Sequence, residues 1–210
     1  KGRLWVGTLD GGLNLLDASG QNFIHYDQTN SIMKSASVSC LYEAEDSTLW
    51  VGTYGGLLQI SEDGPWKFYN HDLKNPKSIS HNYVFSAFCD LNNRLWVGTN
   101  NGLCYKEANS DEFKILTTKN GLPSDVIVGI LGSANGKIWV STHNGISSFD
   151  PNHPTIFRNY DKHDGLPGNM FNVGAATRSR DGLLWFGGVQ GAVRFNPELL
   201  TDNSFEPQVQ

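Results

Sequence analysis

The sequence predicts an all-β fold, a segment of a β-propeller with about five four-stranded antiparallel blades. A short apolar segment recurs five times along the 210 residues, at 4–8, 49–53, 95–99, 138–142 and 184–188. Each copy contains one tryptophan, and these lie 43 to 46 residues apart, at Trp5, Trp50, Trp96, Trp139 and Trp185. A glycine stands six residues after each, at Gly11, Gly56, Gly102, Gly145 and Gly191. Such a period, built from strand-like units, is typical of propeller blades.

Each unit divides into four short strands. In the second unit these are 38–43, 49–53, 57–60 and 66–69. The counterparts of the last strand are 23–26, 113–116 and 157–160. The turn between the first two strands is a dipeptide that tolerates positive φ, as tight hairpins require. These dipeptides are Asp46-Ser47, Asn92-Asn93, Asn135-Gly136 and Asp181-Gly182. No stretch has helical periodicity of useful length.

The two end units are incomplete. The first lacks its opening strand and the last lacks its fourth, so we expect 18 strands grouped as three, four, four, four and three. We expect the repeats to fill residues 1–198 and an exit segment to fill 199–210. Exposed edges on end blades are a liability, which predicts further blades before Lys1. By alignment, the first and fifth units carry one more residue before the third strand, at 10–12 and 190–192.

The recurring tryptophan has a packing role in this interpretation. Leu, Trp and Val in succession make a strand apolar on both faces, as a blade between two neighbours needs. A small residue stands two positions later and leaves room beside the ring. These residues are Gly7, Gly52, Gly98, Ser141 and Gly187. A role as sugar-stacking platforms is the alternative, and repetition in every blade favours packing.

Composition excludes several classes of partner. The formal charge is −5, so the chain has no basic footprint for nucleic acid or anionic membrane. No apolar run approaches the roughly 18 residues of a membrane span. Cys40, Cys89 and Cys104 occupy different positions relative to their tryptophans, so they are not a repeated ligand set. Buried free thiols are expected rather than a disulfide.

The repeat resembles a known family. The unit Leu-Trp-Val-Gly-Thr-x-x-Gly-Leu is similar to the two-component-regulator propeller repeat, and the resemblance covers about residues 1–198. The linkers 120–124 and 164–169 match the family's Gly-Leu-Pro segment. Residues 170–172, 187–191 and 195–197 resemble the last blade of such arrays. After the last blade, the family usually continues into an immunoglobulin-like module. Residues 205–209 resemble the segment that leads into this module.

The resemblance implies a function. Propellers of this family, expected here as part of a larger, seven-bladed array, form the periplasmic half of membrane-spanning hybrid histidine kinases or diguanylate cyclases. Many of the kinases detect glycan fragments. The resemblance therefore implies an oligosaccharide ligand, contacts with the remaining blades of the parent propeller and a homodimeric ectodomain. The signalling enzyme would lie outside this chain, so we expect neither catalytic residues nor a cofactor here.

The expected binding face follows from the meander of each blade. The second-to-third-strand turns and the linkers between blades share one end of the propeller, and loops on a rigid scaffold are where binding residues concentrate. The turns supply Asp10, Tyr54, Asn100, Asn101, His143, Asn144 and Gln190. The linkers supply His81, Asn82, Ser124, Asp125, Asn169 and Asn172. Neutral amides with a few aromatics suit a hydroxyl-rich ligand.

The same residues have a second interpretation. Asparagine is also common in tight turns for backbone reasons, and this favours a structural role for Asn100, Asn101 and Asn144. Tyr54 and His143 are less typical of turns and are the stronger candidates for ligand contact.

Two other function classes stay open. For a propeller lyase or hydrolase, His81, His143 and Asp125 would have to meet, and activity would be lost on chelation if a metal were required. None of the six histidines has short metal-ligand spacing, and neither a Gly-x-Ser-x-Gly elbow nor a calcium loop is present, so no metal site is expected. For a protein-interaction scaffold, a large exposed apolar patch would be expected instead of a polar cavity.

Overall fold

The computed structural model describes residues 2–62 and 64–200. These form five antiparallel sheets with 18 strands. The first two sheets contain β1 (Trp5–Gly7), β2 (Leu13–Leu16) and β3 (Phe23–Tyr26), then β4 (Val38–Glu43), β5 (Leu49–Thr53), β6 (Leu57–Ile60) and β7 (Lys67–Tyr69). The third and fourth contain β8 (Val84–Cys89), β9 (Leu95–Thr99), β10 (Gly102–Lys106) and β11 (Lys114–Leu116), then β12 (Ile127–Gly132), β13 (Ile138–Thr142), β14 (Gly145–Phe149) and β15 (Arg158–Tyr160). The fifth contains β16 (Phe171–Arg178), β17 (Leu184–Gly188) and β18 (Gly191–Phe195). Three short 3-10 helices are η1 (Thr118–Asn120), η2 (Lys162–Asp164) and η3 (Pro197–Leu199).

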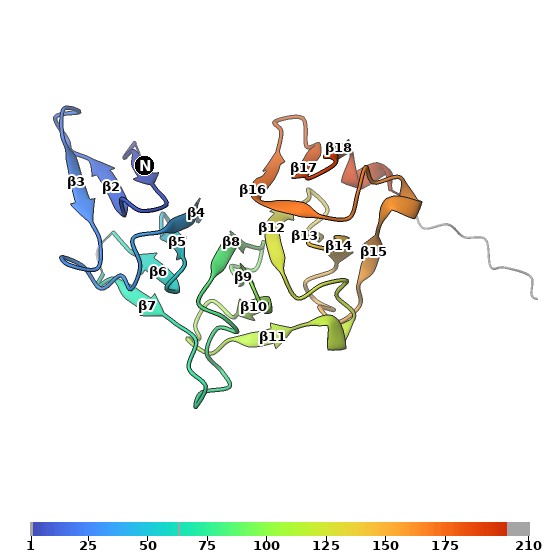
Figure 1. The fold of residues 1–210 in the computed structure, drawn as a ribbon, viewed down its shortest axis with the longest axis horizontal. Coiled ribbons are helices and arrows are strands. Elements are labelled where there is room, and N and C mark those ends of the chain that lie inside the picture. Colours follow the sequence, from blue (N-terminus) through green and yellow to red (C-terminus); the bar gives the residue numbers. More distant parts are fainter. Residues whose placement is uncertain (1, 63, 201–210) are drawn as a thin grey trace, which may run out of the picture.

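The sheets are the blades of a propeller. Strand order within each sheet follows the chain, and the sheets hold three, four, four, four and three strands, as predicted. The opening strands β4, β8, β12 and β16 lie together in the middle, and the closing strands β3, β7, β11 and β15 lie at the rim (Figure 1). The first and fifth blades are the two ends of the arc. The predicted fold class is therefore confirmed.

The predicted hairpin turns also form. The second residue of each dipeptide has positive φ, namely 69° at Ser47, 58° at Asn93, 81° at Gly136 and 85° at Gly182. The extra residue expected in the first blade is present, because Gly12 rather than Gly11 takes the positive-φ position before its third strand. The prediction of an extra residue in the fifth blade was wrong. Gly188 pairs with Gly191 just as Thr142 pairs with Gly145.

The core lies between neighbouring blades. Every residue of β5, β9 and β13 is buried, because these strands have a blade on either side. Trp96 is 0% exposed and Trp139 is 2% exposed, whereas Trp185 in the last blade is 36% exposed. No described blade covers the outward face of the last blade, where Trp185 lies. The packing role predicted for the tryptophan therefore holds in the middle blades.

The small residue that follows the tryptophan makes room for the next blade. A Cβ atom at Gly98 would lie 2.9 Å from both the Cγ2 atom and the carbonyl oxygen of Ile127. Ile127 opens β12, so the contact is with the innermost strand of the following blade. At Gly52 a Cβ atom would similarly come within 2.9 Å of Val84, which opens β8. Glycine thus sets how closely the second strand of one blade approaches the opening strand of the next.

The three cysteines are free thiols, as expected. Cys104 is fully buried, and its sulfur accepts a hydrogen bond from the Ser80 backbone N–H (3.3 Å). Burial raises the pKa of Cys104 to about 11 and that of Cys40 to about 12. Both thiols therefore stay protonated and unreactive at neutral pH.

Gly98→Ala tests the spacing between blades. The added methyl group meets a backbone oxygen that cannot move aside, so we expect the free energy of unfolding to fall by about 1–3 kcal/mol. The matched control is Ser141→Ala, which shortens the side chain at the equivalent position of the next blade. Urea unfolding followed by tryptophan fluorescence measures both, and equal stability of the two variants would contradict the packing role of Gly98.

Candidate ligand-binding face

The turns and linkers meet at one end of the propeller, through backbone hydrogen bonds. The Tyr54 N–H donates to the Ser37 carbonyl (3.1 Å), and the Asn100 N–H donates to the Tyr83 carbonyl (3.1 Å). His143 and Val189 make the same bond to the linkers of the fourth and fifth blades. In these four blades the turn therefore rests on the linker that enters its own blade, and the turns and linkers share one face as predicted.

In the first four blades a threonine at the end of the second strand closes the turn, whereas the fifth blade has Gly188 there. The Thr99 hydroxyl donates to the Gly102 carbonyl (2.9 Å) and accepts from the Asn101 N–H (3.0 Å). A hydroxyl can do both at once. Thr8, Thr53 and Thr142 make the same pair of bonds in their turns. The recurring threonine thus holds the turn backbone and leaves the intervening side chains to vary.

Four aromatic side chains gather where the second and third blades meet. Tyr54 and Tyr83 have ring centroids 5.0 Å apart at an interplanar angle of 30°. His81 meets Tyr83 edge-on at 5.0 Å, and Phe85 meets Tyr54 edge-on at 6.2 Å. Phe85 is buried, while Tyr54 and Tyr83 are 36% and 45% exposed. We call Tyr54, His81, Tyr83 and Phe85 the aromatic cluster.

Sequence reasoning missed Tyr83. It stands just before the buried Val84 that opens β8, so alternation along the strand turns the two side chains to opposite sides. That position holds Ser37, Val126 and Met170 in the other blades. The sequence signal that could have identified Tyr83 is an aromatic residue at a position whose residue type varies from blade to blade.

His81 is a neutral hydrogen-bond donor in this cluster. Its Nδ1 atom accepts the Tyr83 backbone N–H at 2.9 Å, which places the ring proton on Nε2. Burial, and to a smaller extent the neighbouring His71, lowers the pKa of His81. Asn82 has a structural bond instead, because its Oδ1 atom accepts the His71 backbone N–H (2.7 Å).

The asparagines of the other turns differ in how far they are engaged. Asn144 donates to the Pro123 carbonyl (3.1 Å) and accepts from the Asn169 amide (3.3 Å), so it joins two linkers. Asn100, Asn101 and His143 are exposed, and within residues 2–62 and 64–200 their side chains make no hydrogen bond. The side chains of Asn100, Asn101 and His143 are therefore available to a ligand.

The remaining candidates lie at other junctions. Asp125 accepts from the Thr118 N–H (2.6 Å), and Ser124 accepts from the Val126 N–H (3.1 Å). Asp10 receives a long bond from the Ser37 hydroxyl (3.5 Å). Two further candidates also lie away from the aromatic cluster. Gln190 lies against Gly168, and Asn169 belongs to the linker into the fifth blade. The structure brings only part of the predicted set together.

Asn172 was assigned to a linker, and this was wrong. It lies inside β16, where Phe171 pairs with Gly188 and the next pair is Ala176 with Phe186. The residues between form a bulge within the strand, and Asn172 is exposed there.

Two arrangements that an enzyme site could use are not found among the described residues. They contain no group of three His, Cys, Asp or Glu side chains placed to hold a metal ion. Within the same residues, no hydrogen bond joins His81, His143 and Asp125. No helix among them is long and apolar enough to cross a membrane.

One copy of the repeat matches a known family model. Residues 32–55, which include the first two strands of the second blade, match the family model described as the two component regulator propeller. This stretch carries the two component regulator propeller repeat. Histidine kinase P4 of Formosa agariphila is 26% identical over 264 aligned residues, which cover 98% of this chain and 19% of that protein. The chain thus spans about a fifth of the length of this relative.

Solved structures share the propeller fold. The extracellular domain of BT4673 from B. thetaiotaomicron superimposes with a TM-score of 0.76 at 22% identity, covering 97% of this chain and 30% of that one. Virginiamycin B lyase from Staphylococcus aureus superimposes with a TM-score of 0.66 at 16% identity, covering 93% of this chain and 67% of that one. At these identities the similarity concerns the fold, and it carries no chemistry from the lyase to this chain.

The His81 environment predicts a pH dependence of stability. Because the fold lowers the pKa of His81 below its ordinary value of about 6.5, the folded state favours the neutral ring. Its contribution to stability is complete above that value and is lost as the pH falls through the folded-state pKa. His81→Asn keeps an acceptor for the Tyr83 N–H but cannot titrate. Urea unfolding at about pH 5 and about pH 8 should therefore show a smaller loss for the variant. Equal losses would contradict this role.

Proposed function

We propose that this propeller is the ligand-binding, extracytoplasmic part of a membrane-spanning two-component sensor, and that the aromatic cluster binds a neutral glycan fragment. The observation that carries the proposal is the pair of half-exposed rings of Tyr54 and Tyr83 on the face formed by the variable turns. The sensor role is supported by the repeat, by the relative called a histidine kinase and by the extracellular domain that shares the fold.

The chemistry of the cluster suits a sugar. A sugar ring presents an apolar face of C–H groups, which packs on flat aromatic surfaces such as those of Tyr54 and Tyr83. Its hydroxyl groups need directional donors and acceptors, which His81 Nε2 and the amides of Asn100 and Asn101 supply. Asn100 is tied to this site by its backbone bond to Tyr83.

The charge of the site also favours a neutral ligand. Every member of the aromatic cluster is uncharged near neutral pH, and so are the adjacent turn residues Asn100 and Asn101. A phosphate or sulfate would require compensating lysine or arginine side chains, which none of these residues provides. A neutral oligosaccharide therefore fits better than an anionic one.

The wider architecture belongs to the same proposal. The periplasmic location, the remaining blades of the parent propeller, a homodimeric ectodomain and a kinase or cyclase output domain are all inferred from the family. His143 and Asn144 lie on the same face, one blade further along, where a longer oligosaccharide would reach.

Calorimetric titration with a panel of neutral oligosaccharides tests the site. Removing one aromatic contact of about 1–1.5 kcal/mol should weaken binding about tenfold, so we expect this loss for both Tyr54→Ala and Tyr83→Ala. Phe23→Ala is the matched control, because Phe23 is an exposed aromatic residue at the rim of the first blade. A ligand that binds both tyrosine variants as tightly as the parent chain would refute the assignment.

A further inference from the structure

A second pocket, of about 180 Å³, opens at the end of the propeller opposite the aromatic cluster. Because each blade is an antiparallel meander, the turns after its first and second strands lie at opposite ends. The pocket is formed by the ends of the opening strands and by the turns that follow them, and four consecutive blades contribute to it. The lining residues that matter below are Tyr42, Glu45, Phe88, Asp90, Gly132 and Arg178.

Two aromatic rings form the apolar side of this pocket. Tyr42 and Phe88 have ring centroids 5.8 Å apart, and the Tyr42 hydroxyl donates to the Cys89 carbonyl (3.4 Å). A Cβ atom at Gly132 would collide with the Phe88 ring, so this glycine leaves room for the ring over the fourth blade. Burial raises the pKa of Cys89 to about 12 and also raises the pKa of Tyr42. This side of the pocket is therefore uncharged at neutral pH.

Two opposite charges flank the rings, and both side chains are exposed. Glu45 belongs to the second blade, and its carboxylate has no hydrogen bond or ion pair within residues 2–62 and 64–200. Arg178 of the fifth blade donates one long bond to the Gly132 carbonyl (3.4 Å), and its other N–H groups have no partner in that part of the chain. Asp90 is the third charged lining residue, but it is already engaged by the indole N–H of Trp96 (2.9 Å).

This charge pattern favours a ligand that carries both signs of charge. Glu45 would repel a simple anion, and Arg178 would repel a simple cation. The Arg178 guanidinium can hold a carboxylate through two parallel N–H bonds, while Glu45 can accept hydrogen bonds from an ammonium group. Sites for drug-sized ligands measure roughly 300–1,000 Å³, so a ligand of this pocket must be smaller. Its apolar part would lie against the two rings.

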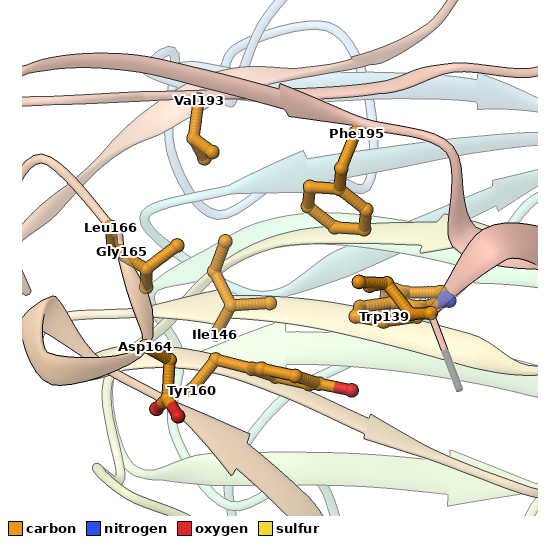
Figure 2. A pocket seen from close by; sticks show the side chains of 9 residues that line it. Trp139, Ile146, Tyr160, Asp164, Gly165, Leu166, Val193 and Phe195 are labelled. Atoms are coloured by element: carbon orange, nitrogen blue, oxygen red, sulfur yellow. The ribbon is translucent and has the colours of Figure 1, made fainter. Parts of the chain in front are cut away.

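The pocket between the fourth and fifth blades has a different character (Figure 2). It measures about 120 Å³, and Phe195 faces Trp139 and Tyr160 across it (Figure 2). Asp164 is the only charged residue in its lining, so it has no cationic group to hold a carboxylate. Leu200 also lines it, and the rest of the expected exit segment, 201–210, lies outside the described residues.

We propose that the pocket at the end opposite the aromatic cluster binds a free α-amino acid with an apolar side chain. The carboxylate of the amino acid pairs with Arg178, its ammonium group pairs with Glu45, and its side chain packs against Phe88. The opening strands β4 and β16 approach each other, so a ligand held by both charges joins the second blade to the fifth. This site is separate from the aromatic cluster and does not depend on glycan binding.

Calorimetric titration of the 210-residue chain with L-leucine, L-isoleucine, L-methionine and L-phenylalanine tests the proposal. We expect at least one to bind, and we expect Glu45→Gln and Arg178→Gln each to weaken it at least about tenfold, because a charge-assisted hydrogen bond is lost. Arg180→Gln is the matched control, since it removes the same charge from the adjacent turn, outside the pocket lining. It should leave the affinity unchanged, and so should Tyr83→Ala.

Two analogues of leucine separate the roles of the two charges. Isopentylamine lacks the carboxylate and 4-methylpentanoate lacks the ammonium group, so each should bind at least about tenfold more weakly than leucine. Arg178→Gln should not weaken isopentylamine further, and Glu45→Gln should not weaken 4-methylpentanoate further, which a general loss of folding would not reproduce. The proposal is overturned if none of the four amino acids binds, if binding survives both substitutions, or if Tyr83→Ala abolishes it.

Discussion

The contact between a tryptophan and the next blade is the interaction on which this fold depends. Trp96 stacks on Tyr105 of its own blade at 4.7 Å and meets Phe149 of the next blade at 5.0 Å. Trp139 meets Phe195 of the fifth blade in the same way, at 4.9 Å. A single four-stranded blade cannot bury both of its faces, so stability arises from such junctions between neighbours. Trp185, with no described neighbour beyond it, remains partly exposed.

The same repeat separates scaffold from recognition. Glycine beside the tryptophan sets the distance between blades, and threonine at the strand end closes the turn. Between the threonine and the next strand only one or two side chains are unconstrained, and these change from blade to blade. Tyr54 is one of them, and it meets Tyr83 because each turn rests on a linker. Variable chemistry on an invariant frame is what a recognition surface requires.

The sequence was sufficient for most of the fold because its signals are local and repeated. Tryptophan spacing and turn dipeptides placed all 18 strands. The fourth strands begin one residue later than expected in the three middle blades, because Trp66, Phe113 and Phe157 pack into a junction before strand pairing starts. The bulge in β16 likewise displaced Asn172 from the linker where it was expected.

The candidate site was harder to predict because it depends on contacts between distant residues. Tyr83 lies 29 positions from Tyr54, and only the fold brings their rings together. The hydrogen bonds of Asn82 and Asn144 are equally invisible in the sequence, although they decide that these side chains are engaged. Local turn chemistry identifies which positions are loops, but it does not say which loop side chains remain free.

The central claim is that the repeated residues build the scaffold and the variable turn residues bind the ligand. Hydrogen exchange of the chain with and without a bound oligosaccharide tests this claim most directly. If the repeated residues only build the frame, amides of β5, β9 and β13 exchange slowest in both states. Added protection on binding is then confined to the turn after Thr53, the linker around Tyr83 and the turn after Thr99. Ligand-dependent protection spread along the tryptophan strands, with none at Tyr54 or Tyr83, would contradict it.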